Sequence, residues 1–168
     1  MPKYTKYKRL AFYWLASLSL AIPFYYLLSL IMPQKHAFGA WYRMPAYHWE
    51  HPISYILIPC FFYGILANIF AKKFTFYNKI QRIFLTFVII ALTIALSSPF
   101  GGMLWHFHDM QAGYFPKNWL QIIIIEGISW GIQMGWVIIL LSIPYNIFGS
   151  IICYFLTKNG IELFKIEE

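Results

Sequence analysis

The chain has 168 residues, of which 60% are hydrophobic and only 11% are charged, whereas soluble domains carry about 25% charged residues. A domain of this length could not bury so much apolar surface in water, so the composition excludes a soluble fold and predicts a one-domain integral membrane protein. The net charge of +7 does not indicate a nucleic-acid partner, because the basic residues lie in short clusters beside apolar runs, as in membrane proteins.

The first half of the chain contains two apolar runs that are long enough to cross a bilayer as helices. The first, about residues 10–32, follows the basic start MPKYTKYKR. Its apolar part is too long for a cleavable signal peptide, so a retained span is predicted, with a kink at Pro23. The second run, about residues 53–71, begins directly after Pro52, a position at which the first turn of a helix accepts proline.

Two further runs complete a predicted all-α bundle of four transmembrane helices. The third span, about residues 83–100, is expected to stop at Pro99 and the glycine pair that follows it. The fourth, about residues 120–156, has no Lys or Arg over 37 residues and would be about 55 Å long as one helix. A straight span does not need this length, so we expect a kink at Pro144, first turns that lie at the interface, or a short extra segment.

The basic residues predict how the bundle is oriented. Ten of the 13 lie before the first span, between the second and third, or after the fourth. Because Lys and Arg accumulate on the cytoplasmic side, both termini are expected to be cytoplasmic. Loops 33–51 and 101–118 then face the periplasm or cell exterior, and the expected location is a bacterial inner (plasma) membrane. Trp and Tyr residues in these loops are typical of a membrane interface.

The two cysteines, Cys60 and Cys153, fall inside apolar runs without a motif partner and are expected to be buried packing residues. The size, span number and termini resemble, in architecture alone, the bacterial inner-membrane disulfide-bond oxidoreductases and lipoprotein signal peptidase. The first family needs cysteine pairs in its outward loops and the second uses two aspartates. The outward loops here contain no cysteine and the chain has one aspartate, Asp109, so both chemistries are disfavoured.

All five histidines, His36 among them, lie in the two predicted outward loops. In the segment HWEHP, His48 and His51 are three positions apart, so on a helix they project from one face and could share a metal ion. In HFHD, His106 and His108 are two apart and would point to opposite sides of an extended chain. They could share an ion only through a turn, which the preceding glycine pair permits.

The start of the second span and the end of the third lie at the same depth in an antiparallel bundle, so HWEH and HFHD can meet. Imidazoles with a carboxylate suit Zn²⁺, Cu²⁺ or Fe²⁺. We therefore expect a metal site built from the four histidines, with Asp109 as a ligand or as an orienting group. Two alternatives stay open, namely interfacial histidines that bind headgroups and water, and metal-free acid–base catalysis by a histidine with Asp109 or Glu50. The predicted ligands are His48, His51, His106 and His108.

The fourth run carries two further patterns. Glu126 lies within WLQIIIIEGISWGIQMGW, where a carboxylate is costly and is expected to face the bundle interior or a wet cavity and to have a partner. Ser129 and Gln133 continue a polar line from it, and we expect Glu126 to act as an acid–base group beneath the histidines. Glycines four residues apart allow close approach of another helix; they are Gly127, Gly131 and Gly135.

The combined pattern predicts a small metal-dependent membrane enzyme with an outward-facing site. A bound metal ion can turn water into a nucleophile at neutral pH, and a site at headgroup depth implies a lipid or other amphiphile as the substrate. One alternative is a non-catalytic membrane subunit or immunity-type protein that binds a membrane-protein partner, or a second copy, through the glycine ladder. Another is a metal or haem handling protein.

Overall fold

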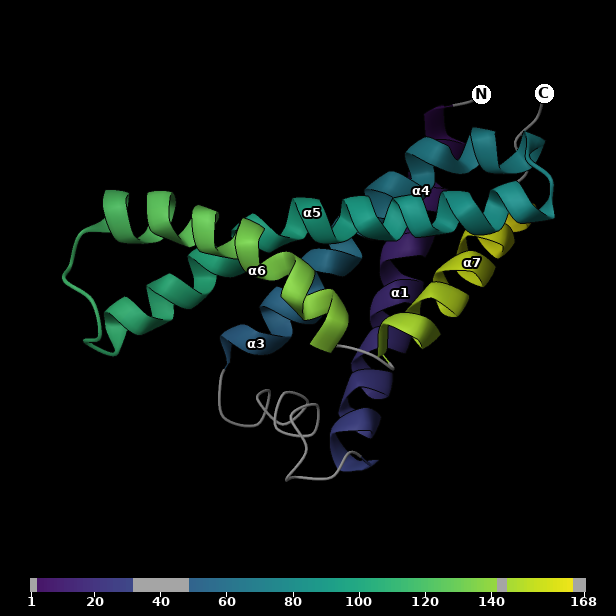
Figure 1. The fold of residues 1–168 in the computed structure, drawn as a ribbon. Coiled ribbons are helices and arrows are strands. Elements are labelled where there is room, and N and C mark those ends of the chain that lie inside the picture. The colour runs from purple at the N-terminus through teal and green to yellow at the C-terminus, as the bar shows by residue number, and fades with distance from the viewer. Residues whose placement is uncertain (1–2, 32–48, 142–144, 165–168) are drawn as a thin grey trace.

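The computed structural model describes residues 3–31, 49–141 and 145–164, and all regular structure in these ranges is helical (Figure 1). Within the described ranges, four helical stretches are long and apolar enough to cross a membrane, which supports the predicted helical membrane bundle; they are Thr5–Leu27, Glu50–Phe76, Lys79–Gln111 and Trp119–Val137. The elements in chain order are α1 (Lys3–Ile31), α3 (Glu50–Pro52), η2 (Ile53–Leu57), α4 (Ile58–Phe76), α5 (Lys79–Gln111), η3 (Trp119–Glu126), α6 (Gly127–Leu141) and α7 (Tyr145–Leu163).

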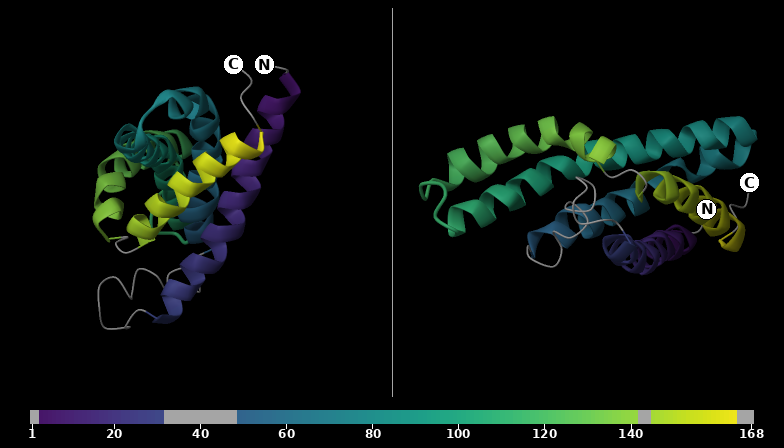
Figure 2. Two further views of the ribbon diagram at one scale, coloured as in Figure 1. Left: turned by 90° about the vertical axis from the view of Figure 1, so that its right-hand side faces the viewer. Right: turned by 60° about the horizontal axis from the view of Figure 1, so that its bottom comes forward.

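The start of α1, the α4–α5 turn and the end of α7 lie at one end of the molecule (Figures 1 and 2). The rings of Phe12 and Phe164 are 5.8 Å apart there. Arg82 donates hydrogen bonds to the carbonyl oxygens of Tyr77 (2.7 Å) and Thr75 (3.1 Å). Asn78 caps α5 in a reciprocal capping box, which satisfies backbone donors at the start of the helix.

The core lies where α1, α4, α5 and α7 meet. Tyr13 donates to the carbonyl oxygen of Thr157 (3.1 Å), and Tyr63 donates to that of Cys153 (3.0 Å). Buried tyrosine hydroxyls need such partners, so these bonds fix how α7 lies against α1 and α4. The buried apolar cluster consists of Tyr13, Tyr63, Leu66, Ala67, Phe74, Leu85, Ile89 and Leu156.

The expected end of the third span at Pro99 is wrong, since α5 continues through this proline to Gln111. Pro99 lacks the N–H that would bond to the carbonyl oxygen of Ala95. The hydroxyl of Ser98 donates to that same oxygen at 3.4 Å, and such side-chain compensation lets transmembrane helices contain proline. Most of the predicted loop 101–118 is therefore helical, because residues 101–111 form about three further turns of α5.

The fourth predicted run is two helices rather than one, because α6 ends at Leu141 and α7 begins at Tyr145. Figures 1 and 2 show the two running in different directions, with α6 antiparallel to α5 and α7 beside α1. The interval contains Pro144 and lies outside the described residues. This division explains the excess length of the run.

The glycine ladder of α6 (Gly127, Gly131 and Gly135) packs against α5 of the same chain. A Cβ atom added to Gly131 would collide with the carbonyl oxygen of Ser98, and one added to Gly102 of α5 would collide with that of Gly127. A Cβ atom on Gly135 would lie 2.8 Å from Ser98 Cβ. The predicted close approach of another helix is therefore present, and the helix is α5 of the same chain.

Candidate functional site

The first turn of α3 and the last turns of α5 meet at a cluster of ionisable side chains. His108 Nδ1 lies 3.3 Å from Glu50 Oε1 and 3.2 Å from Asp109 Oδ1. The side chain of Glu50 is fully buried, whereas those of His108 and Asp109 are 24% and 34% exposed. The expected meeting of HWEH and HFHD is confirmed for these residues, which we call the carboxylate–histidine cluster (Glu50, His108 and Asp109).

The local folding of the chain explains why the cluster forms. Glu50 stands in the first turn of a helical stretch that runs to Phe76, where the positive end of the helix dipole favours a carboxylate. The continuation of α5 beyond Pro99 carries His108 and Asp109 on to this turn. If α5 ended at Pro99, as the sequence suggested, its last helical residues would lie two turns short of Glu50.

His51, next to Glu50, is also fully buried but faces aromatic rings. Its Nε2 lies 3.5 Å from Tyr25 Oη of α1. Its ring centroid lies 4.2 Å from that of Tyr55, one helical turn later, and 6.2 Å from that of Trp105 of α5. Adjacent positions on a helix point about 100° apart, so Glu50 contacts α5 while His51 contacts both α1 and α5.

His106 is directed away from the carboxylate–histidine cluster. Its Nδ1 lies 3.1 Å from the carbonyl oxygen of Gly102, and its ring stacks on Phe115 and contacts Trp130 of α6. Positions 106 and 108 are about 200° apart on a continuous helix, so the turn that would have brought both histidines to one ion does not form. The sequence pattern HFHD thus supplies one member of the cluster and one packing residue.

These placements do not support the predicted metal site. Among the residues that the structure describes, no group of three or more His, Cys, Asp and Glu side chains is arranged to hold a metal ion. His51 and His108 both lie near Trp105, but only His108 contacts the carboxylates, whereas His51 faces Tyr25 and Tyr55. His106 packs against α6. His48 and His36 lie outside the described residues.

Glu126 has a partner, as expected, but on its own element. Gln121 Nε2 donates to Glu126 Oε1 at 3.1 Å. The two are five positions apart, a spacing that a π-helical turn brings to one face because its hydrogen bonds span five residues. Ser129 and Gln133 continue the polar line, joined by a 3.2 Å hydrogen bond, and both are exposed. The line therefore runs along the outer surface of η3 and α6.

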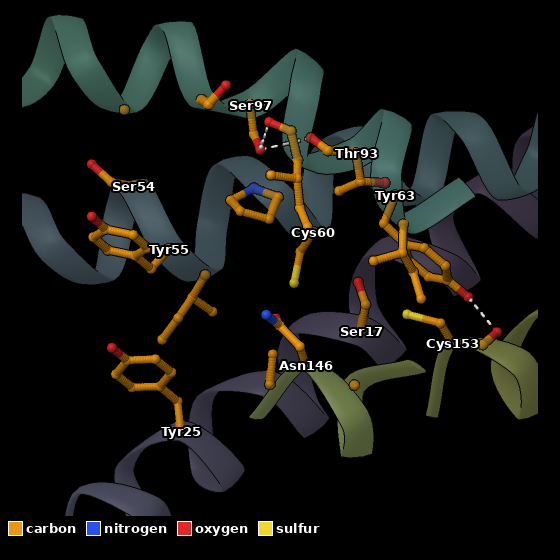
Figure 3. Close-up of a pocket in the computed structure, with 18 of the residues that line it drawn as sticks. Ser17, Tyr25, Ser54, Tyr55, Cys60, Tyr63, Thr93, Ser97, Asn146 and Cys153 are labelled. Atoms are coloured by element: carbon orange, nitrogen blue, oxygen red, sulfur yellow. Dashed lines mark hydrogen bonds between the residues drawn. The ribbon is translucent and has the colours of Figure 1, made fainter. Parts of the chain in front are cut away.

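The sequence analysis missed the aromatic residues around His51 and a cavity behind them. The cavity measures about 160 Å³ and lies between α1, η2, α4, α5, α6 and α7. Tyr25, Tyr55 and Trp105 line it and also contact His51. Figure 3 shows the Cys60 thiol and the Asn146 amide pointing into this space. The contact of Tyr55 with His51 could have been predicted from the sequence, because the two residues are four positions apart and lie on one face of a helix.

The carboxylate–histidine cluster has the parts of an acid–base site. A carboxylate that accepts a hydrogen bond from Nδ1–H fixes the tautomer of the imidazole, so Nε2 carries the lone pair and can take up a proton. Glu50 and Asp109 both have a carboxylate oxygen within hydrogen-bonding distance of His108 Nδ1.

Comparison of the chain with models of known protein families, with curated proteins and with solved structures finds no match.

Proposed function

We propose that this protein is a small multi-pass membrane enzyme in which the carboxylate–histidine cluster performs acid–base chemistry on a lipid or other amphiphile. The observation that carries the proposal is the position of His108 Nδ1 within 3.3 Å of Glu50 and 3.2 Å of Asp109. In this arrangement His108 Nε2 takes a proton from water as the water oxygen attacks an ester group of the substrate. The bond to the leaving oxygen then breaks, and the imidazolium returns the proton to that oxygen. Glu50 and Asp109 orient the imidazole and stabilise its positive charge.

The substrate class follows from where the cluster stands along the spans. Glu50 begins one candidate span, and His108 and Asp109 lie three and two residues before the end of the next. The two helix ends that carry the cluster are thus at the depth of lipid headgroups. The distribution of Lys and Arg supports an outward-facing cluster, and the membrane we propose is a bacterial inner membrane.

Acid–base catalysis has more support than the Zn²⁺, Cu²⁺ or Fe²⁺ chemistry that the histidine pattern suggested. His106 faces α6, and no group of three or more His, Cys, Asp and Glu side chains among the described residues is arranged to hold a metal ion. Metal analysis of the purified protein tests this point directly, and its visible absorbance spectrum tests for haem.

The enzymatic proposal is tested by reconstituting the protein into liposomes made from bacterial lipid extract and following the lipids by mass spectrometry. We expect wild-type protein to convert a lipid, and His108→Ala to lower the rate by about 10²–10⁴-fold, the usual contribution of a general base. His106→Ala is the matched control, since it removes the same side chain from the opposite face of the same helix. Equal rates for wild-type and His108→Ala protein would refute the role of the cluster.

A second candidate function, that of a non-catalytic subunit, is favoured by the exposed polar line of η3 and α6. Ser129 and Gln133 are exposed in an apolar helix, and polar side chains in a bilayer favour hydrogen bonds to another helix. The glycine ladder already contacts α5, so a partner would use this polar face. Gln133→Leu would then abolish a complex detected by cross-linking in membranes, whereas Ile132→Leu beside it would not.

A further inference from the structure

We infer that the cavity between α1, η2, α4, α5, α6 and α7 binds one hydrocarbon chain whose polar end lies at Ser54. This inference deepens the proposed function, because it assigns the cavity to the chain of the amphiphile on which the neighbouring cluster would act. The cavity reaches from Tyr25, Tyr55 and Trp105, which contact His51, to Tyr63 and Leu156 in the core (Figure 3).

The wall of the cavity is less polar than its residue types suggest. The hydroxyls of Thr93 and Ser97 donate to the carbonyl oxygens of Ile89 (2.8 Å) and Thr93 (2.7 Å). Ser17 donates in the same way to Trp14 at 3.1 Å. Hydroxyls that bond back to their own helix are satisfied, so these residues present carbon atoms to a ligand. The cavity therefore suits a hydrocarbon chain over most of its length.

Two polar groups are exceptions, namely the Asn146 amide, which points into the cavity (Figure 3), and Ser54. Ser54 is 7% exposed, and its hydroxyl has no hydrogen-bond partner among the residues that the structure describes. A buried hydroxyl without a partner is unfavourable, so a ligand that brings a polar atom to this point gains affinity. Figure 3 shows Ser54 on the same side of the cavity as Tyr55 and Tyr25. The polar end of the ligand would therefore lie beside the aromatic neighbours of His51.

The size of the cavity limits the occupant to a single chain. Its volume of about 160 Å³ is close to that of an engineered apolar cavity of roughly 150 Å³ that binds benzene. A hydrocarbon chain enters such a space one segment wide, and the rest of a two-chain lipid would remain in the bilayer. A free fatty acid and one chain of a phospholipid share this chemistry.

Binding can be measured through the tryptophans of the cavity wall. Trp105 and Trp130 line the cavity, so a brominated chain that enters it quenches their fluorescence on contact. The probes are 9,10-dibromostearic acid and a phosphatidylcholine with one dibrominated chain, each titrated into the purified full-length protein in detergent. We expect saturable quenching. Saturation by the fatty acid alone or by the phospholipid alone identifies which source of the chain fits.

Gly149→Leu is the decisive variant, because Gly149 lines the cavity and a Cβ atom there meets no heavy atom of the described residues within 4 Å. Because the position is open at Cβ, we expect the leucine side chain to occupy cavity volume and the apparent affinity to fall at least tenfold. Ile151→Phe adds bulk to an exposed position of the same helix and should leave the affinity unchanged. If Gly149→Leu protein does not fold, Ala21→Leu fills the same cavity from α1.

The polar end is tested separately. Ser54→Ala should weaken binding of dibromostearic acid several-fold while leaving a brominated alkane of equal length unaffected. His108→Ala should bind both probes as the wild type does, so binding can succeed even if the enzymatic proposal fails. The inference is overturned if neither probe gives saturable quenching, or if the Gly149→Leu and Ala21→Leu variants bind as tightly as the wild type.

Discussion

Two glycines of this chain provide a matched test of how its helices pack. We predict that Gly131→Ala destabilises the protein and that Gly149→Ala stabilises it. A Cβ atom on Gly131 of α6 would collide with the carbonyl oxygen of Ser98 and lie 3.0 Å from Cα of Pro99. A Cβ atom on Gly149 of α7 would meet no heavy atom of the described residues within 4 Å. Both positions are helical, so the substitutions differ chiefly in what the added methyl group meets.

The magnitudes follow from two opposing contributions. Alanine gains about 1 kcal/mol over glycine within a helix, and this gain applies at both sites. Overpacking costs about 1–3 kcal/mol, and at Gly131 the obstacle is backbone, so α5 and α6 must separate. The helix gain cancels in the comparison. The free energy of unfolding of Gly131→Ala should therefore be about 1–3 kcal/mol below that of Gly149→Ala, close to the full cost of overpacking.

The assay is reversible unfolding of the purified protein in mixed micelles by a denaturing detergent, followed by circular dichroism. Gly149→Ala should require more denaturant than the wild type, and Gly131→Ala less. Equal midpoints for the two variants would refute the close packing of α5 against α6. Stabilisation by Gly131→Ala would show that this face of α6 is not in contact with α5.

Two further predictions use the same assay. Asn68→Leu should lower the free energy of unfolding by about 3 kcal/mol or more, because removing the partner of a buried charge is strongly destabilising. Arg9 is 3% exposed, and its Nε donates to Asn68 Oδ1 at 2.8 Å. An effect below about 1 kcal/mol would contradict the burial of Arg9. Tyr63→Phe should lower the free energy of unfolding by about 0.5–2 kcal/mol. The Tyr63 hydroxyl forms hydrogen bonds with the carbonyl oxygen of Cys153 and with Thr157 Oγ1, both at 3.0 Å. An unchanged unfolding midpoint would contradict these bonds.

The structural features that could be predicted are the helices that correspond to long apolar runs in the sequence. Four stretches were expected to span a membrane, and in the described part of the chain four helices have the required length and apolar character, although the fourth covers only the first part of the expected run. The contact between Glu50 and His108 could be anticipated because neighbouring antiparallel spans bring their ends to the same depth. Such inferences need only the length of a helix and the direction of the chain.

The features that could not be predicted depend on which partner compensates for a locally unfavourable residue. Pro99 normally ends a helix, but the Ser98 hydroxyl binds the carbonyl oxygen that lacks its donor, and nearby Gly102 packs against Gly127 of α6. Both contacts support continuation of α5. The direction of Glu126 was missed for a related reason, since η3 is π-helical and its side chains do not follow the α-helical spacing.

The continuity of α5 also decides how the two histidines of HFHD are used. On one helix they must diverge, so His108 meets Glu50 while His106 packs against Trp130 of α6. The residue of α5 that faces His51 is Trp105, which also lines the cavity. One turn of α5 thus borders both the ionisable cluster and the apolar space. A reaction at the polar end of an amphiphile requires this adjacency, because the group that reacts must stay at the membrane surface while its chain is held below.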